Sequence, residues 1–229
     1  MADTTMVKDT TERIALSPTK GLLKSFFYFF GGKTLRLNND LGALGIFFFR
    51  SFFMIFRINA IPDIIAQVYF IGAKSTQIVL LVGFFTGMVL GLQLYFVLVK
   101  FGSVGVLGTA IALTLIREMG PVLAAIMITA RAGSAMTAEI GIQRISEQID
   151  ALSTMRIDPL GYLISPRIAA AIISFPILTA FFDLIGILGA WVSGCLLLGV
   201  NSGTYFYRVV SSTQIDDIMG GFYKSIVFG

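Results

Sequence analysis

The sequence predicts an all-α protein that crosses a membrane several times. Of its 229 residues, 56% are hydrophobic and 13% are charged, and the mean hydropathy is +0.86. A soluble domain of this length could not bury so much apolar surface. The apolar residues also gather into runs long enough to span a bilayer, and polar stretches separate these runs. We therefore expect a bundle of transmembrane helices with extramembrane connections.

The region before residue 78 is expected to lie outside the bilayer core. Residues 1–20 are polar, which predicts a disordered tail, and they lack the apolar core of a signal peptide. Residues 21–77 mix aromatic clusters with basic residues, which predicts amphipathic helices at the membrane interface. Gly32-Lys33-Thr34 resembles the end of a phosphate-binding loop, but Phe27 stands where that loop needs a glycine. We therefore expect that this chain does not itself bind ATP.

Residues 78–229 are expected to form the transmembrane domain. The predicted spans are residues 78–99, 104–130 and 168–198, and a further span begins at about residue 218. The last apolar run is cut short at Gly229, so we expect that C-terminal sequence is missing.

One face of the first predicted span changes character along its length. Gly83, Gly87 and Gly91 recur every four residues, a spacing that lets two helix backbones approach closely. At 100° per residue, the same face continues with bulky apolar residues: Leu90, Leu94, Val97, Leu98 and Phe101. Two interpretations remain open here, a helix–helix contact throughout or a tight contact that opens into an apolar cavity.

A few polar residues interrupt the apolar runs. Arg117 and Glu118 lie within the second span and Asp183 within the third. Charges at such positions are costly, so they indicate either a functional site or an internal ion pair, and the sequence leaves both open. The chain has no histidine, which argues against an enzyme. The single cysteine, Cys195, is expected to be a packing residue.

The stretch between the second and third spans, residues 131–167, has a helical pattern at about residues 137–156. Ile142, Ile145, Ile149 and Leu152 form an apolar stripe, and the other face carries Glu139, Gln143, Glu147 and Asp150. A helix that binds lipid headgroups presents Lys and Arg, whereas this face is mainly acidic. The pattern therefore favours docking to a basic groove on a protein partner. The distribution of Lys and Arg places this stretch and the N-terminus in the cytoplasm.

Several motifs in this order carry a family resemblance: LIREMGP at 115–121, RAGSAMTAEIG at 131–141 and EQIDALSTMRIDP at 147–159. With GMVLGLQ at 87–93 and SPR at 165–167, the chain from about Ile61 onward closely resembles the MlaE/YrbE family of ABC-transporter permeases. A departure is Ile142-Gln143, where the family usually has Thr-Met or Leu-Met.

The resemblance implies a homodimeric permease with five spans in the inner membrane of a Gram-negative bacterium, some of them beyond or cut by Gly229. It implies that phospholipids move between the inner membrane and the outer envelope, and that this chain is a transport subunit and not an enzyme. The implied partners are a cytoplasmic ABC ATPase that binds ATP and Mg, a STAS-domain subunit and a periplasmic MCE-domain protein, with no nucleic acid.

The resemblance also implies roles for individual residues. The helix at about residues 137–156 becomes a coupling helix that contacts the ATPase through Glu139, Gln143, Arg144, Glu147, Gln148 and Asp150. The lipid cavity would be lined by Leu90, Gln93, Leu94, Val97, Leu98, Phe101, Arg117 and Glu118. The alternatives are a proton-coupled secondary transporter that uses Glu118 and Asp183, or a membrane scaffold that transports nothing.

Overall fold

The structure is a computed structural model, and it describes residues 34, 38–47, 49–51 and 61–229. The chain divides into two compact units, Met1–Arg50 and Ser51–Gly229. In the first unit, residues 38–47 and 49–50 are helical and mostly exposed. The predicted disordered tail, and most of the predicted interfacial region before Ile61, lie outside the described residues.

The second unit is built on long helical stretches. Within the described residues, three stretches are long and apolar enough to cross a membrane: Ile61–Lys100, Val104–Ile145 and Leu160–Leu197. The first comprises α3 (Ile61–Val68), the π-turn η2 (Tyr69–Ala73) and α4 (Lys74–Lys100). The second comprises η3 (Val104–Val106), α5 (Leu107–Thr114), η4 (Leu115–Met119), α6 (Gly120–Ile128), η5 (Thr129–Gly133) and α7 (Ser134–Ile145). The third comprises η6 (Leu160–Ile164), α9 (Ser165–Trp191) and η7 (Val192–Leu197).

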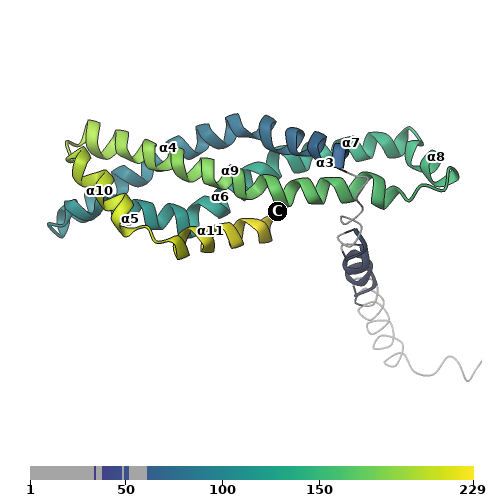
Figure 1. Ribbon diagram of the computed structural model, residues 1–229, viewed down its shortest axis with the longest axis horizontal. Helices are drawn as coiled ribbons and strands as arrows, with labels where there is room; N and C mark the ends of the chain where they lie inside the picture. The colour runs from purple at the N-terminus through teal and green to yellow at the C-terminus, as the bar shows by residue number, and fades with distance from the viewer. Residues whose placement is uncertain (1–33, 35–37, 48, 52–60) are drawn as a thin grey trace, which may run out of the picture. The chain divides into compact units, whose positions relative to one another are not determined.

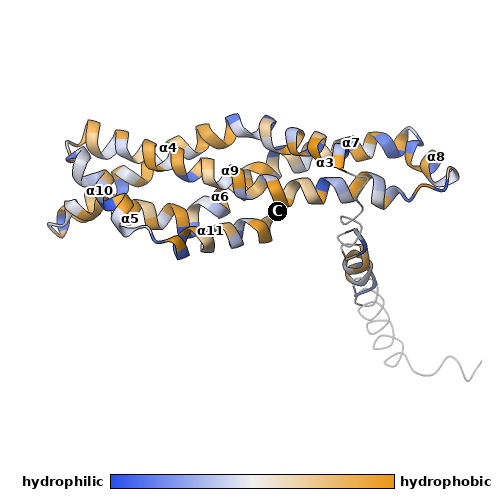
Figure 2. Cartoon of the chain, in the orientation of Figure 1, coloured by the Kyte–Doolittle hydropathy of each residue, from blue (hydrophilic) through white to orange (hydrophobic). Residues whose placement is uncertain are grey.

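Shorter helices connect or follow these stretches. They are α8 (Gln148–Thr154), α10 (Ser202–Ser212) and α11 (Ile215–Phe228). The Asn201 side chain caps α10 by accepting a hydrogen bond from the Thr204 backbone N–H at 3.0 Å. A capping box between Gln214 and Asp217 begins α11. The long helices run side by side, with α7 and α8 at one end of this unit and α10 at the other (Figure 1). Polar residues concentrate at these two ends, while apolar residues predominate along the length between them (Figure 2).

Glycines bring α4 and α9 into backbone contact. A Cβ atom at Gly87 would lie 1.8 Å from the carbonyl oxygen of Gly186, and one at Gly189 would lie 2.1 Å from that of Phe84. Gly83 and Gly91 lie one helical turn before and after Gly87. Gly83 faces α9, and Gly91 faces the end of α9 and its continuation η7. Both helices therefore contribute glycines to one seam, which allows the close approach that membrane helices use for packing.

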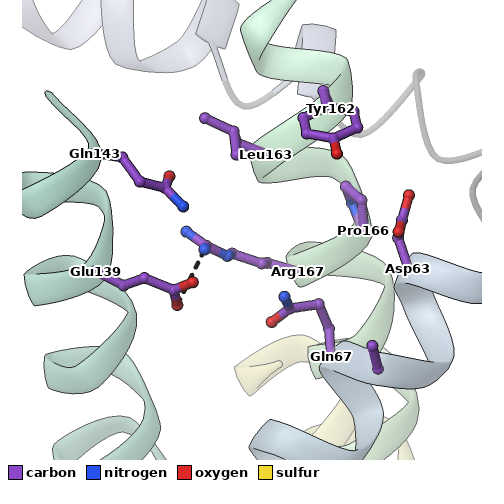
Figure 3. A pocket seen from close by; sticks show the side chains of 9 residues that line it. Asp63, Gln67, Glu139, Gln143, Tyr162, Leu163, Pro166 and Arg167 are labelled. Carbon is purple, nitrogen blue, oxygen red and sulfur yellow. Dashed lines mark ion pairs between the residues drawn. The ribbon is translucent and has the colours of Figure 1, made fainter. Parts of the chain in front are cut away.

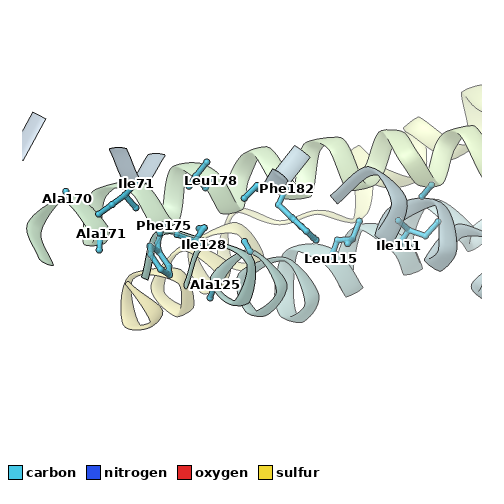
Figure 4. Close-up of a cluster of buried hydrophobic side chains, with 14 of the residues drawn as sticks. Ile71, Ile111, Leu115, Ala125, Ile128, Ala170, Ala171, Phe175, Leu178 and Phe182 are labelled. Carbon is cyan, nitrogen blue, oxygen red and sulfur yellow. The ribbon is translucent and has the colours of Figure 1, made fainter. Parts of the chain in front are cut away.

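The apolar core extends from this seam to the second stretch. Phe182 of α9 and Leu115 and Ile111 of the second stretch are fully buried, as are Ile71 and Ile128 nearer the α7 end. These side chains form a continuous row between the helices (Figure 4). The second stretch thus packs against the α4–α9 pair mainly through side chains.

The observed helices differ from the predicted ones in two respects. Residues 61–77, expected to belong to the interfacial region, are the first part of the long helical stretch Ile61–Lys100. The single helix expected at 137–156 is two helices, because the chain turns at Ser146 and Glu147. Glu147 adopts a left-handed conformation with φ 58°, which a regular right-handed helix cannot contain.

The glycine seam makes a direct prediction about stability. Gly87→Ala should destabilise the protein by about 2 kcal/mol or more, because the new methyl group meets backbone that cannot rotate away. The control is Gly220→Ala on α11, where a Cβ atom meets nothing within 4 Å; it should be neutral or slightly stabilising, since alanine favours helix. Thermal unfolding of both purified variants in detergent would check this. Equal midpoints would contradict the backbone contact.

Candidate functional site

An apolar groove lies between α4 and the middle of the second stretch. It has a volume of about 440 Å³ and is lined by Leu81, Val82, Phe85, Thr86, Val89 and Leu90 of α4, Met119 of η4 and Leu123 of α6. Thr86 supplies the single polar side chain among these lining residues. The groove is therefore suited to a hydrocarbon group.

The residues predicted to line a lipid cavity separate into two groups. Leu90, Leu94 and Leu98 are half-buried and pack against the apolar core, since they follow the glycine face that contacts α9. Gln93, Val97 and Phe101 are exposed. At 100° per residue, Gln93 and Val97 lie on the same flank of α4 as Thr86 and Val89, which line the groove.

Sequence reasoning missed most of the groove itself. Phe85, Val89, Met119 and Leu123 were not predicted site residues, although they line it. The α4 residues could have been identified from the sequence, because they lie on the helix face next to the face of Gly83, Gly87 and Gly91. Met119 and Leu123 carried no such signal, because their place depends on how the second stretch packs.

Arg117 and Glu118 form ion pairs with α11. Arg117 Nε lies 2.9 Å from Asp217 Oδ1, and Lys224 Nζ lies 2.8 Å from Glu118 Oε1. Arg117 and Glu118 therefore do not form the internal pair that one interpretation allowed. Asp217 and Lys224 were not predicted site residues, because nothing in their local sequence links them to a motif about a hundred residues earlier.

Pro121 explains one contact in this charge cluster. Proline has no backbone N–H, so it cannot bond to the carbonyl four residues earlier, which belongs to Arg117. Lys224 Nζ donates to that carbonyl oxygen at 2.6 Å. Gly221 also lets α11 approach this turn, because a Cβ atom there would lie 2.6 Å from the Ile116 carbonyl oxygen. The charge cluster (Arg117, Glu118, Asp217 and Lys224) thus fastens α11 to η4.

Asp183 of α9 faces the same turn from the other side. A Cβ atom at Gly120 would lie 1.8 Å from Asp183 Oδ1, so the glycine makes room for this carboxyl group. Oδ1 is buried and has no hydrogen-bond partner among the described residues. Around η4 the chain therefore holds acidic groups on two sides. Within the described range, no group of His, Cys, Asp and Glu side chains could hold a metal ion.

The α7–α8 segment (Ser134–Thr154) carries the residues predicted to contact an ATPase. Arg144, Glu147, Gln148 and Asp150 are exposed on it, and Arg144 Nη1 lies 2.5 Å from Asp150 Oδ1 across the turn between the two helices. Ile142 and Ile145 are also exposed, by 65% and 86%. Glu139 and Gln143 differ, because both line a polar pocket at the base of the segment, together with Arg167.

Comparison with known proteins identifies the family of this chain. Residues 64–229 match the family model described as Permease MlaE. The chain belongs to the MlaE permease family. The resemblance predicted from the motifs is confirmed, as is the predicted fold class, an all-α protein that passes through the membrane several times.

Named relatives cover most of this MlaE-family chain. It is 44% identical over 168 residues to the intermembrane phospholipid transport system permease protein MlaE of Haemophilus influenzae, which covers 73% of this chain and 64% of that protein. It is 38% identical over 200 residues to a probable ABC transporter permease protein of Rickettsia bellii, covering 87% of this chain and 77% of the relative. The Synechocystis relative, also a probable ABC transporter permease protein, is 37% identical over 173 residues and covers 76% of this chain and 65% of the relative.

The motifs that carry the MlaE resemblance fall at breaks in the helices. LIREMGP forms η4 and the first residues of α6, while RAGSAMTAEIG spans the end of η5 and the first part of α7. Arg131 of the second motif donates to the carbonyl oxygen of Phe70, within the π-turn η2, at 2.8 Å. Such π-turns often occur at functional sites. These motifs therefore mark positions where one helix is joined to the next.

The charge cluster makes a prediction about α11. Lys224→Met should loosen this helix, because it removes the contacts to both Glu118 Oε1 and the Arg117 carbonyl while keeping an apolar stem of similar length. We expect amide hydrogen exchange in residues 215–228 to become several-fold faster. Asp216→Asn, a change at an exposed site on the same helix, should leave the exchange unchanged. Equal protection in both variants would show that the cluster does not hold α11.

Proposed function

We propose that this chain is the membrane permease subunit of an ABC transporter that moves phospholipids between the inner membrane and the outer envelope of a Gram-negative bacterium. The observation that carries the proposal is the apolar groove on α4 and α6, which reaches η4, the turn that carries Arg117 and Glu118 of the charge cluster. Met119 lines the groove, and its neighbour Glu118 belongs to the cluster. The name of the Haemophilus relative, an intermembrane phospholipid transport system permease protein, supports this substrate.

The groove and the charge cluster match the two parts of a phospholipid. The acyl chain would lie along the apolar side chains of the groove, where water is excluded. The phosphate would meet Arg117 or Lys224, whose side chains keep 58% and 43% of their surface exposed while paired. Both cations can therefore donate a hydrogen bond to a phosphate oxygen through the surface that their ion pairs leave exposed.

A second copy of the chain would complete this site. The groove is open on one side, and α4 exposes Leu81, Phe85, Val89 and Phe96 along its length. A homodimer that packed this face against its copy would enclose the groove and form a central lipid cavity. Such a cavity would also contain Gln93, Val97 and Phe101, which are exposed in the single chain.

The α7–α8 segment would dock on a cytoplasmic ATPase that binds ATP and Mg. The segment lies at the end of the second long helical stretch and exposes isoleucines beside the acidic residues Glu147 and Asp150. A basic groove with an apolar floor would complement both. The start of α3 lies at the same end of the helices as this segment (Figure 1), so it would also face the cytoplasm. The N-terminus would be cytoplasmic too, as the distribution of Lys and Arg predicts. A STAS-domain subunit and a periplasmic MCE-domain protein would complete the complex.

Filling the groove tests the proposed function. Val89 lines the groove and is 59% exposed, so Val89→Trp should occupy the acyl-chain site without disturbing the core. We expect ATP-dependent phospholipid transfer in proteoliposomes to fall about tenfold, as for a loss of ~1.4 kcal/mol in binding. The control is Leu184→Trp on α9, a 61% exposed position away from the groove, which should transfer lipid at the unaltered rate.

Other outcomes of the same assay would point elsewhere. Equal transfer by the two tryptophan variants would contradict the groove as the lipid site. Transfer that needs no ATP and stops with an uncoupler would favour a proton-coupled transporter, in which Glu118 and Asp183 carry the protons. No transfer at all by the complete complex would favour a scaffold.

A further inference from the structure

A buried ion pair joins the α7–α8 segment to the third long helix. Arg167, near the start of α9, keeps 7% of its side-chain surface exposed, and its Nη2 atom lies 3.1 Å from Glu139 Oε2 of α7. A guanidinium group this buried is costly unless a carboxylate accompanies it. Glu139 of α7 must therefore stay close to Arg167 of α9.

Three helices contribute polar side chains to the pocket around this pair. Asp63 and Gln67 come from α3, Glu139 and Gln143 from α7, and Arg167 from α9 (Figure 3). The pocket has a volume of about 150 Å³. Three buried atoms have no hydrogen-bond partner among the described residues, namely Arg167 Nη1, Gln67 Oε1 and Gln143 Oε1. The guanidinium group is thus only partly engaged and has room to shift.

The α7 helix has little else to hold it. In the described part of the chain, it packs extensively only against its own neighbours, η5 and α8, with Met136 reaching the apolar core near its start. One helical turn before α7, Arg131 ties η5 to the first stretch through its bonds to the Phe70 carbonyl and Ser75 Oγ. Beyond Arg131, the described residues provide one polar link between α7 and the rest of the bundle. That link is the Glu139–Arg167 pair.

Movement at Arg167 would reach the groove through the seam. Arg167 belongs to α9, and α9 touches α4 backbone to backbone at Gly87 and Gly189. Helices packed this closely move together, because no flexible side chain lies between them. The flank of α4 beside that seam lines the apolar groove. A continuous path therefore leads from α7 through Glu139 and Arg167 to the groove.

We propose that Arg167 is the positioning residue that transmits movement of the α7–α8 segment to α9, which rests on the proposed function of this segment as the ATPase contact. In the arrangement seen here, Arg167 holds Glu139. When the ATPase displaces α7, α9 follows, because separating the pair would leave the buried guanidinium group without its carboxylate.

The test uses the complete complex of this chain with its ATPase in proteoliposomes. Three quantities are measured: the amount of ATPase bound, the rate of ATP hydrolysis, and the phospholipid transferred per ATP hydrolysed. Glu139→Gln keeps the shape but replaces a charge-assisted hydrogen bond with a weaker neutral one. We expect it to retain bound ATPase and ATP hydrolysis while lipid transfer per ATP falls about tenfold.

Asp63→Asn changes a second carboxylate that lines the same pocket. It should leave the lipid transferred per ATP and the bound ATPase unchanged, because Arg167 pairs with Glu139 and not with Asp63. Asp216→Asn, at an exposed site on α11, is the matched control and should leave all three quantities unaltered. Both test variants preserve side-chain volume, which avoids the misfolding that removal of the buried Arg167 would risk.

Unchanged lipid transfer per ATP in Glu139→Gln, or an equal loss in Asp63→Asn, would overturn the inference. A parallel loss of bound ATPase and hydrolysis, at a constant transfer ratio, would also overturn it, because that pattern indicates a purely structural pair. Both outcomes presuppose an unaltered complex that moves lipid with ATP. An unaltered complex that moves none would overturn the proposed function and this inference with it.

Discussion

The backbone contact between α4 and α9 is the constraint on which the rest of the bundle depends. Gly87 meets Gly186 and Gly189 meets Phe84 at distances that leave no space for a Cβ atom. Inside a bilayer, lipid tails are as apolar as leucine, so close packing rather than exclusion of water holds such helices together. This seam fixes which flank of α4 is covered and which remains open to form the groove.

The second long stretch is attached to that pair in a different way. It packs through side chains and is interrupted by π-turns. Polar side chains lie at these interruptions. Lys224 bonds to the Arg117 carbonyl, Asp183 lies beside Gly120, and Arg131 bonds to the Phe70 carbonyl. Such joints are adjustable, since side chains can exchange partners where packed backbones cannot. The chain thus combines a rigid pair of helices, α4 and α9, with a second helical stretch whose polar joints would let it move against them.

Much of this arrangement could be predicted from the sequence, because it follows from local patterns. The glycine spacing at Gly83, Gly87 and Gly91 indicated a close helix contact, and the ordered motifs indicated the family. The partners of the charged residues could not be predicted. Arg117 pairs with Asp217 and Glu139 with Arg167, contacts that depend on how distant segments fold together and leave no periodic signal. The turn at Glu147 was also missed, because a non-glycine residue in a left-handed conformation carries no reliable local mark.

The central claim is that an ATPase drives lipid movement through the α7–α8 segment. The most direct measurement is ATP-dependent transfer of a fluorescent phospholipid in proteoliposomes that contain the ATPase and either the unaltered chain or its Glu147→Lys/Asp150→Lys variant. Both substitutions reverse exposed charges on the segment, so they should repel a basic groove while leaving the bundle intact. The account predicts that the variant loses both bound ATPase and lipid transfer, while Asp216→Lys retains both. A double variant that still binds the ATPase and transfers lipid at the unaltered rate would contradict it.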